Sequence, residues 1–372
     1  MIAVFGAGAI GCWVGGRLAA GGARVTLIGR ARMLGELASG LRTTDLDGGE
    51  ARAEVSTEAS TEASAEVSTE ASTEASTEAS TDERVGTAAS ARARVSVATE
   101  PGAARGAELV LVTVKSAQTA EAGAALAAVL PPGAVVVSLQ NGVRNADILR
   151  EALPGRRVLA AMVPFNVIRR GPGAYHRASA GALRIDDDPA AGPLLAACRA
   201  AGLAIEPRRD MAAVQWAKLL MNLNNAINAL SGLPLAAELA QRPYRRCLAA
   251  AQREALGLLA RAGIGVARLT PIPPGWMPRL LGLPDRAFGL LARRVVAIDP
   301  TARSSMWDDL EAGRPTEIEY LQGEIVELAR RVAGASGAGA PINGALVELV
   351  RAAEAGGRRD FSGEELVARL GI

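Results

Sequence analysis

The sequence has few aromatic residues, one histidine and three cysteines, and each scarcity excludes a kind of site. Aromatic residues make up 3% of the 372 positions, so Ala, Val and Leu must fill most of the core. A single histidine, His176, cannot build a histidine-rich metal centre. The three cysteines are far apart and suit neither a disulfide framework nor a zinc site. We therefore expect no bound metal and a reducing compartment.

Long apolar runs and basic clusters are also missing. The most apolar stretch, around Leu219–Leu239, contains four asparagines and a Ser-Gly-Leu-Pro break, which is unlike a membrane span. No group of Lys and Arg with interleaved aromatics indicates a nucleic-acid surface. The first residues already have the pattern of a strand, which leaves no room for a cleavable signal. We expect a cytoplasmic protein whose partners include neither membrane nor nucleic acid.

One segment lacks a hydrophobic face altogether. Residues 54–81 repeat a Ser-Thr-Glu-Ala unit, with a glutamate at every fourth position from Glu54 to Glu78. Like charges four residues apart repel on a helix, and no apolar stripe is present to dock it. We expect a disordered surface insertion at about residues 50–92. The rest of the chain is then more basic than its net charge of +2, which suits an anionic ligand.

The first half of the chain alternates short apolar runs with helical patterns, as in a βαβ sheet. From Asp210 onward the pattern changes to long helices. We expect an α/β Rossmann domain over residues 1–208 and an all-α domain over residues 209–372. The expected strands are Ile2–Phe5, Arg24–Ile28, Leu41–Asp45, Arg94–Ala98, Glu108–Val114, Val135–Leu139, Val158–Val163, Ala174–Arg177 and Ala182–Ile185. The expected helices are Ile10–Ala20, Arg30–Ala38, Ser116–Leu130, Pro189–Ala201, Asp210–Leu230, Tyr244–Ala262 and Glu317–Ala333.

A glycine-rich turn follows the first strand and opens the first helix. Its sequence is Gly6-Ala7-Gly8-Ala9-Ile10-Gly11. In this context the first glycine permits the tight turn, the second lets a pyrophosphate approach the backbone, and the third allows close helix packing. The alternative is an ordinary glycine-rich turn, but the position after a strand favours a dinucleotide.

The residue type at the end of the second strand bears on which dinucleotide is bound. NAD sites usually place an acid there to hold the ribose 2′-hydroxyl. This chain has Arg30 and nearby Arg32 instead, and a guanidinium pairs well with a 2′-phosphate. The sequence favours NADP(H), although two solvated arginines beginning a helix would have the same pattern.

Two further loops follow expected strands at the edge where such sheets bind ligands. Lys115 ends one strand and is a candidate contact for a negative group. Asn141 follows another, in an Asn-Gly pair, and is a candidate contact for cofactor or substrate. Turn chemistry and a surface lysine explain these two positions equally well.

The helix expected over Asp210–Leu230 is apolar except for one arc. At 100° per residue Gln215, Lys218, Asn222 and Asn225 share that arc. Desolvation would lower the pKa of Lys218, which favours proton donation to a developing alkoxide. A solvent-facing polar stripe is the alternative, but such a stripe usually carries several charges.

A second polar cluster runs from Ser304 to Tyr320. The spacing of Thr316 and Glu319 predicts a capping box, which makes Glu319 a structural residue. Glu317 would then lie in the first helical turn, where it orients a substrate hydroxyl, steadies the lysine or simply stabilises the helix.

Taken together, these blocks resemble the ketopantoate reductase (2-dehydropantoate 2-reductase) family. The matching segments are the glycine turn, the strand ending in Lys115, the Asn141-Gly142 pair, Trp216-Ala-Lys218-Leu and the run from Ser304-Ser-Met to Glu317-Ile-Glu-Tyr. The resemblance implies an NADPH-dependent reductase with a C-terminal domain like that of 6-phosphogluconate dehydrogenase. Its substrate would be a small 2-oxo acid, its product pantoate, and a homodimer is a compatible assembly.

The resemblance also implies roles for individual residues. Lys218 would protonate the C2 carbonyl oxygen, and Glu317 would hydrogen-bond the substrate or a water. Ser305 and Asn222 would hold the substrate, Asn141 would bridge cofactor and substrate, and Lys115 would lie beside the cofactor. A second substrate-binding asparagine is expected where this chain has Ala226, and Asn225 would replace it from one position earlier.

Three other functions stay open at this stage. The same scaffold can reduce another 2-oxo acid, because a few side chains decide the substrate. A non-catalytic NADP-binding sensor would keep the fold, although it would have no use for both Lys218 and Glu317. An opine- or hydroxyacid-dehydrogenase relative would be expected to use a histidine or a different lysine, and His176 is poorly placed for that.

Overall fold

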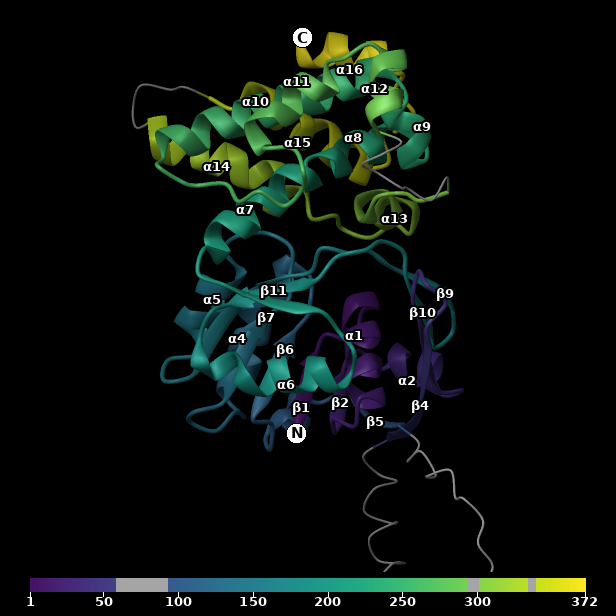
Figure 1. Cartoon of the computed structure of the whole chain (residues 1–372), viewed down its shortest axis with the longest axis vertical. Coiled ribbons are helices and arrows are strands. Elements are labelled where there is room, and N and C mark those ends of the chain that lie inside the picture. Colours follow the sequence, from purple (N-terminus) through teal and green to yellow (C-terminus); the bar gives the residue numbers. More distant parts are fainter. Residues whose placement is uncertain (58–92, 293–300, 334–338) are drawn as a thin grey trace, which may run out of the picture.

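The computed structural model describes residues 1–57, 93–292, 301–333 and 339–372. Every strand of this described part lies before Met211, and helices make up the regular structure after it. Figure 1 shows the two parts stacked along the long axis, with the N-terminus at the end of the sheet farthest from the helices. Strand β1 (Ile2–Phe5) therefore runs toward the helical part, and its carboxyl end faces that part.

The described residues form one twelve-stranded sheet in the order β12-β11-β8-β7-β6-β1-β2-β5-β4-β3-β10-β9. The centre from β8 to β4 is parallel throughout, as expected for a Rossmann domain. The remaining strands are β2 (Val25–Ile28), β3 (Leu41–Thr44), β4 (Glu50–Thr57), β5 (Ala93–Ala98), β6 (Leu109–Val112), β7 (Val135–Ser138), β8 (Arg157–Met162), β9 (Val167–Gly171), β10 (Ala174–Arg177), β11 (Leu183–Asp186) and β12 (Ile205–Arg208).

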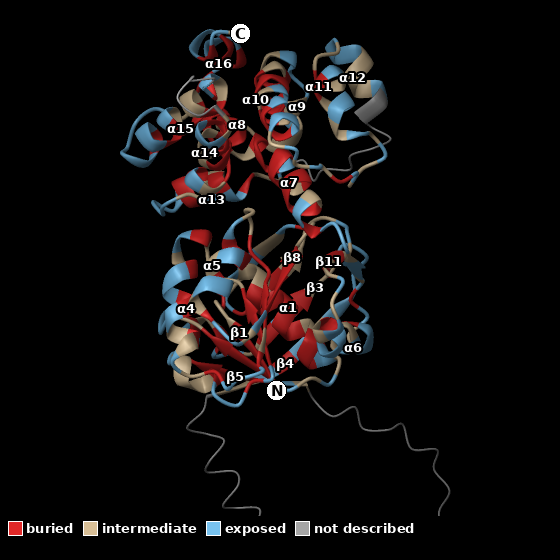
Figure 2. Ribbon diagram, turned by 90° about the vertical axis from the view of Figure 1, so that its left-hand side faces the viewer, coloured by how far each residue is buried: buried red, intermediate tan, exposed pale blue. Residues whose placement is uncertain are grey.

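The central strands form because each is a short, continuous apolar run that is covered on both faces. All four residues of β2 and of β6 are buried, and β1 is buried except at Phe5. Figure 2 shows helices on both faces of the sheet. They are α1 (Ala9–Ala20), α2 (Arg32–Leu37), α4 (Thr119–Ala127), α5 (Asn145–Ala152) and α6 (Gly192–Ala200), with 3-10 turns η1 (Pro101–Ala104), η2 (Ser116–Gln118) and η3 (Pro189–Ala191).

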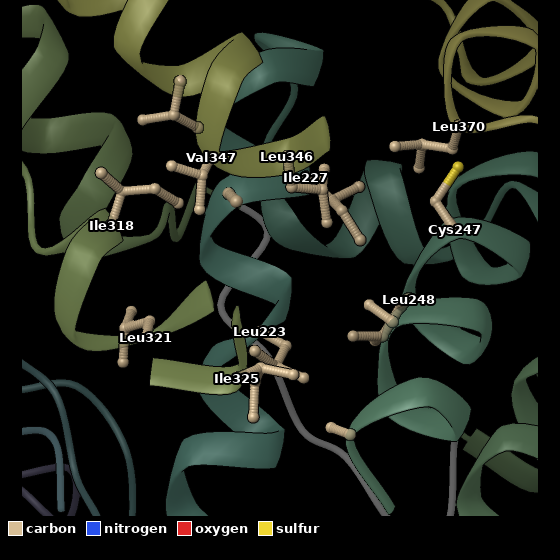
Figure 3. Close-up of a cluster of buried hydrophobic side chains, with 14 of the residues drawn as sticks. Leu223, Ile227, Cys247, Leu248, Ile318, Leu321, Ile325, Leu346, Val347 and Leu370 are labelled. Carbon is tan, nitrogen blue, oxygen red and sulfur yellow. The ribbon is translucent and has the colours of Figure 1, made fainter. Parts of the chain in front are cut away.

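The helical part encloses a separate apolar core around Leu223, Ile227 and Ile325, which Figure 3 shows. Leu223 separates α7 from α8, so the single helix expected over Asp210–Leu230 is two. The helices are α7 (Met211–Asn222), α8 (Asn224–Ser231), α9 (Leu235–Leu239), α10 (Arg242–Arg261), α11 (Met277–Leu281), α12 (Asp285–Ala292), α13 (Ser305–Glu311), α14 (Gln322–Ala333), α15 (Pro341–Glu354) and α16 (Gly363–Leu370), with 3-10 turns η4 (Pro274–Trp276) and η5 (Ile318–Tyr320).

Two further expectations about local structure are wrong. The insertion placed at about residues 50–92 begins too early, because Glu50–Thr57 form β4 between β3 and β5. Residues 58–92, which hold most of the repeat, lie outside the described residues. The capping box is absent as well: Ile318 donates its N–H to Thr316, but Glu319 pairs with Arg351 at 2.6 Å.

Strands β9 and β12 were not predicted, and they widen the sheet at its two edges. In the described segments of the chain, no helix is both long and apolar enough to cross a membrane. The same segments contain no group of three or more His, Cys, Asp or Glu side chains arranged to hold a metal ion.

A buried acid joins three elements of the helical part. Glu238 is fully buried, and its Oε2 accepts hydrogen bonds of 3.1 Å from the side-chain amides of Asn224 and Asn228. Burial raises the pKa of Glu238 to about 8, which the two hydrogen bonds only partly offset. The Oδ1 of Asn228 accepts the N–H of Ser304 at 2.9 Å, so this acid also supports the start of α13.

The raised pKa of Glu238 predicts a pH-dependent stability. The folded protein holds a proton that the unfolded chain loses near pH 4.5, so the stability from this group is complete below that pH and is lost as pH rises toward 8. Glu238→Gln keeps a neutral hydrogen-bonding group, and we expect its Tm to exceed that of the wild type by a few degrees at pH 8 but not at pH 4.5. Glu121→Gln, at an exposed position, is the control. Equal Tm values of wild type and Glu238→Gln at both pH values would contradict the prediction.

Candidate active site

The glycine turn lies where the expected cofactor would approach. Gly6 has a φ of +112°, which favours glycine, and a side chain there would collide with the backbone of Val114. A side chain at Gly11 would collide with the Gly6 carbonyl, so α1 packs closely on the turn. The space beside Gly8 is open, and no side chain caps the N-terminus of α1. Free N–H groups and open space suit a pyrophosphate.

Two arginines lie at the end of the neighbouring strand. Arg30 and Arg32 follow β2 and are exposed. Within the described ranges neither side chain has an ion-pair or hydrogen-bond partner, and no acid stands between β2 and α2. Both guanidinium groups are therefore available to an anionic ligand.

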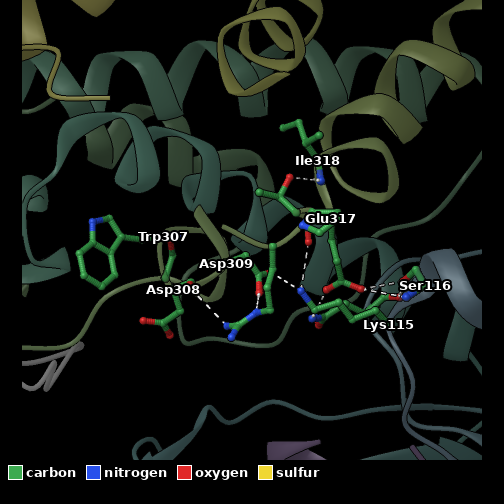
Figure 4. Close-up of polar contacts among 12 residues, drawn as sticks. Lys115, Ser116, Trp307, Asp308, Asp309, Glu317 and Ile318 are labelled. Atoms are coloured by element: carbon green, nitrogen blue, oxygen red, sulfur yellow. Dashed lines mark hydrogen bonds and ion pairs between the residues drawn. The ribbon is translucent and has the colours of Figure 1, made fainter. Parts of the chain in front are cut away.

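Glu317 connects the helical part to two loops of the sheet. Its Oε1 accepts the N–H of Ser116 at 3.1 Å and the hydroxyl of Ser116 at 3.0 Å. Its Oε2 accepts the amide of Asn141 at 3.2 Å. Figure 4 shows the carboxylate of Glu317 turned toward Ser116, with Lys115 beside it. Glu317 precedes η5 and does not lie in the first turn of a long helix, because α14 begins only at Gln322.

Asn141 extends this connection to α7. Its Oδ1 accepts a hydrogen bond of 3.3 Å from the side-chain amide of Asn222. Four separate segments thus meet in one polar chain that runs from Ser116 through Glu317 and Asn141 to Asn222. We call this chain the polar bridge.

Ser116 and Asn145 were not predicted from the sequence, although both support the bridge. Asn145 donates to the hydroxyl of Ser116 at 3.1 Å and also to the Asn141 carbonyl. Thr119 in turn donates to the Oδ1 of Asn145 at 2.8 Å. The sequence could have indicated both residues, because each begins a helical segment that follows a parallel strand: Ser116 begins η2 and Asn145 begins α5. Such helix starts lie at the ligand-binding edge of the sheet.

Lys218 lies on α7, one turn before Asn222, and is half-buried. Its Nζ donates to the Pro164 carbonyl at 3.4 Å. Burial lowers the pKa of Lys218 to about 8. The side chain is partly shielded from solvent, as expected from the apolar residues beside it on α7.

Lysine is rare in this chain, and this feature of the sequence also points to the candidate site. Of 41 basic residues only Lys115 and Lys218 are lysines, and the rest are arginines. An arginine cannot release its proton in a protein, whereas a lysine can. Both lysines lie at the predicted site, where an ammonium differs chemically from a guanidinium.

The remaining predicted residues have different environments. Ser305 is the exposed first residue of α13, while the preceding Ser304 is buried and caps the helix by accepting the N–H of Trp307 at 3.1 Å. Asn225 is half-buried on α8. Ala226 is fully buried in the helical core, so this position does not face a ligand.

Lys115 is held by the helical part. Its Nζ lies 2.6 Å from the Oδ2 of Asp309 and donates to the Pro315 carbonyl at 3.2 Å. Asp309 lies within the polar cluster from Ser304 to Tyr320, but no role was predicted for it. The two neighbours Lys115 and Ser116 thus each bind a different acid of the helical part.

Comparison with known proteins identifies the family. The profile of Ketopantoate reductase PanE/ApbA matches residues 2–189, and that of Ketopantoate reductase PanE/ApbA C terminal matches residues 210–354. A 2-dehydropantoate 2-reductase of Halobacterium salinarum is 32% identical over 270 residues, 71% of this chain and 82% of that protein.

Solved structures have the same architecture. A PanE/ApbA family ketopantoate reductase from Ralstonia eutropha is 29% identical, has a TM-score of 0.71, and is matched over 96% of this chain and 99% of that one. A D-mandelate dehydrogenase with NADH has the same TM-score at 17% identity, with coverage of 96% and 99%, which shows a shared fold only. This chain belongs to the ketopantoate reductase PanE/ApbA family, with its α/β sheet domain and helical C-terminal part.

Proposed function

We propose that this protein is an NADPH-dependent 2-dehydropantoate 2-reductase that forms pantoate for pantothenate synthesis. The observation that carries the proposal is the position of Lys218, half-buried on α7 and one helical turn from the Asn222 end of the polar bridge. Relatives named 2-dehydropantoate 2-reductase support the substrate. In this proposal residues 1–208 bind the cofactor, and residues 209–372 supply Lys218 and Glu317.

The proposed cofactor is NADP(H). Gly6–Gly11 would surround the pyrophosphate, with the N-terminus of α1 directed at it. Arg30, with Arg32, would pair with the 2′-phosphate, since no acid is present to hold a 2′-hydroxyl. When bound, the cofactor supplies a hydride to the carbonyl carbon of the substrate.

Lys218 would donate its proton to the carbonyl oxygen of the 2-oxo acid. At neutral pH a group with a pKa of about 8 is mostly protonated, yet it releases the proton more readily than a solvated lysine. Burial favours the neutral amine that remains after transfer. Arginine at this position would keep its proton.

The other residues would bind and orient the substrate. Glu317 and Asn222 would present hydrogen-bonding groups to the substrate, and Ser305 and Asn225 would complete the polar contacts. Asn141 would bridge cofactor and substrate, and Lys115 would lie beside the cofactor.

One observation favours a second candidate, a reductase of another 2-oxo acid. The family resemblance predicts an asparagine where this chain has Ala226, which is buried in the core. A substrate that needs fewer polar contacts would fit such a site. Rates with NADPH and a panel of branched 2-oxo acids distinguish the two candidates.

The general-acid assignment predicts a large loss of turnover in Lys218→Met. We expect kcat with ketopantoate to fall by about a hundredfold or more, the usual scale for removing a positioned acid. Lys218→Arg should be nearly as slow, because its charge remains but its proton does not transfer. Both variants should bind NADPH as the wild type does. A kcat within threefold of wild type in Lys218→Met would refute the role of Lys218.

The pKa of Lys218 predicts the pH profile of reduction. Because the protonated form is the donor, kcat/KM for ketopantoate should be constant below about pH 7 and fall tenfold per pH unit above about pH 8. Steady-state rates from pH 6 to 10 at saturating NADPH provide the measurement. A profile that stays flat through pH 9.5 would contradict the assignment.

The cofactor assignment predicts a change of preference in Arg30→Ala/Arg32→Ala. Losing the 2′-phosphate partners should raise the KM for NADPH by about tenfold to a hundredfold and leave that for NADH unchanged. Arg24→Ala, at the opposite end of β2 and also exposed, is the matched control. An equal rise for both cofactors would show that the arginines do not recognise the phosphate.

A further inference from the structure

Lys115 is the other lysine of the chain, and residues of the helical part bind its ammonium. It follows β6, at the carboxyl edge where the glycine turn of β1 also lies. Its Nζ has two acceptors on the other part of the protein, the Asp309 carboxylate at 2.6 Å and the Pro315 carbonyl at 3.2 Å. Figure 4 shows Lys115 between Asp309 and the Glu317 carboxylate. Residues of the helical part thus set the position of the ammonium, although Lys115 itself belongs to the sheet domain.

Asp309 is well suited to hold the ammonium of a lysine in one position. Its side chain is only 8% exposed, whereas that of Lys115 is 41% exposed. Its other oxygen, Oδ1, accepts from the Nε of Arg314 at 3.1 Å, and its backbone carbonyl accepts the Arg314 N–H at 2.8 Å. The carboxylate is therefore fixed, while the lysine keeps an open side.

Asp309 lies between two cations, Lys115 and Arg314, and one of them, Lys115, also lies beside the Glu317 carboxylate (Figure 4). A buried carboxylate needs such partners, because an unpaired one is costly. Lys115 and Arg314 therefore hold the acid in place, and the ammonium of Lys115 keeps an exposed side.

We propose that Asp309 is a positioning residue for cofactor binding: it fixes the ammonium of Lys115 at the carboxyl edge of β6, where that ammonium meets an anionic group of the dinucleotide. Asp309 itself touches no cofactor atom. A lysine has a long flexible side chain, so an ammonium fixed before binding loses less conformational freedom when the ligand arrives. The inference rests on the proposed function in one respect, that Lys115 lies beside the cofactor.

Asp309→Asn tests the proposal through direct binding of NADPH, measured by fluorescence titration. We expect the Kd to rise about tenfold, the scale of a lost charge-assisted contact, while kcat at saturating NADPH changes less than twofold. The control is Asp308→Asn, which removes the same charge from the neighbouring residue of α13, and its Kd should equal that of the wild type. Asp309→Glu, which keeps the charge but displaces it, should be intermediate and serves if Asp309→Asn does not fold.

A double-mutant cycle separates positioning from a structural role. If Asp309 acts through Lys115, Asp309→Asn should have little further effect on the Kd in a Lys115→Met background. Additive effects, an unchanged Kd in Asp309→Asn, or an equal effect of Asp308→Asn would each overturn the proposal. The proposed reduction fails in a different way: a wild type that binds NADPH but does not reduce ketopantoate leaves this binding test intact.

Discussion

The Glu317 carboxylate is the contact on which the rest of the site depends. It accepts from the backbone and side chain of Ser116 with one oxygen and from Asn141 with the other, and it comes from the helical part of the chain. These bonds tie the loops after β6 and β7 to the segment that begins η5. Charge-assisted hydrogen bonds to backbone N–H groups are strong and directional, so they fix the helices over the carboxyl edge of the sheet. The helix that carries Lys218 is joined to the same network through Asn222.

The chain has only two lysines, and a lysine can release a proton whereas an arginine cannot. Everywhere else the chain uses arginine for positive charge, and its surface ion pairs, such as that of Arg351 with Glu319, need nothing more. A proton donor needs a group that can become neutral, and a half-buried helix of Ala, Leu and Met favours that neutral form. Lys218, the proposed proton donor, is a lysine on such a helix. Lys115 differs, because Asp309 of the helical part binds its ammonium. In the proposal above, this ammonium binds an anionic group of the cofactor and transfers no proton.

Much of the fold could be predicted, because β1, β2 and β6 are short apolar runs next to a glycine turn or a helical pattern. Strand β4 was missed because its polar residues continue into the repeat, and it forms only by pairing with β3 and β5. The prediction of a capping box was wrong because distant residues bind both groups of the motif. Glu319 pairs with Arg351, and the N–H of Thr316 donates to Glu354. Lys218, Glu317 and Asn141 could be proposed as site residues from the sequence, but their contacts could not be predicted. Ser116 and Glu317 are 201 positions apart, and no local spacing encodes such a pair. The division at residue 208 stays a prediction, with β12 ending at Arg208 and α7 beginning at Met211.

The most direct test of the account is the titration of Lys218 itself. Protein labelled with 13C at the lysine ε-carbon should give two NMR resonances, because the chain has two lysines, and Lys115→Met assigns them. We predict that the Lys218 resonance titrates with a pKa of about 8 and shifts when NADP+ is added. Titration near 10.5, the ordinary value for a solvated lysine, with no response to NADP+, would contradict the account.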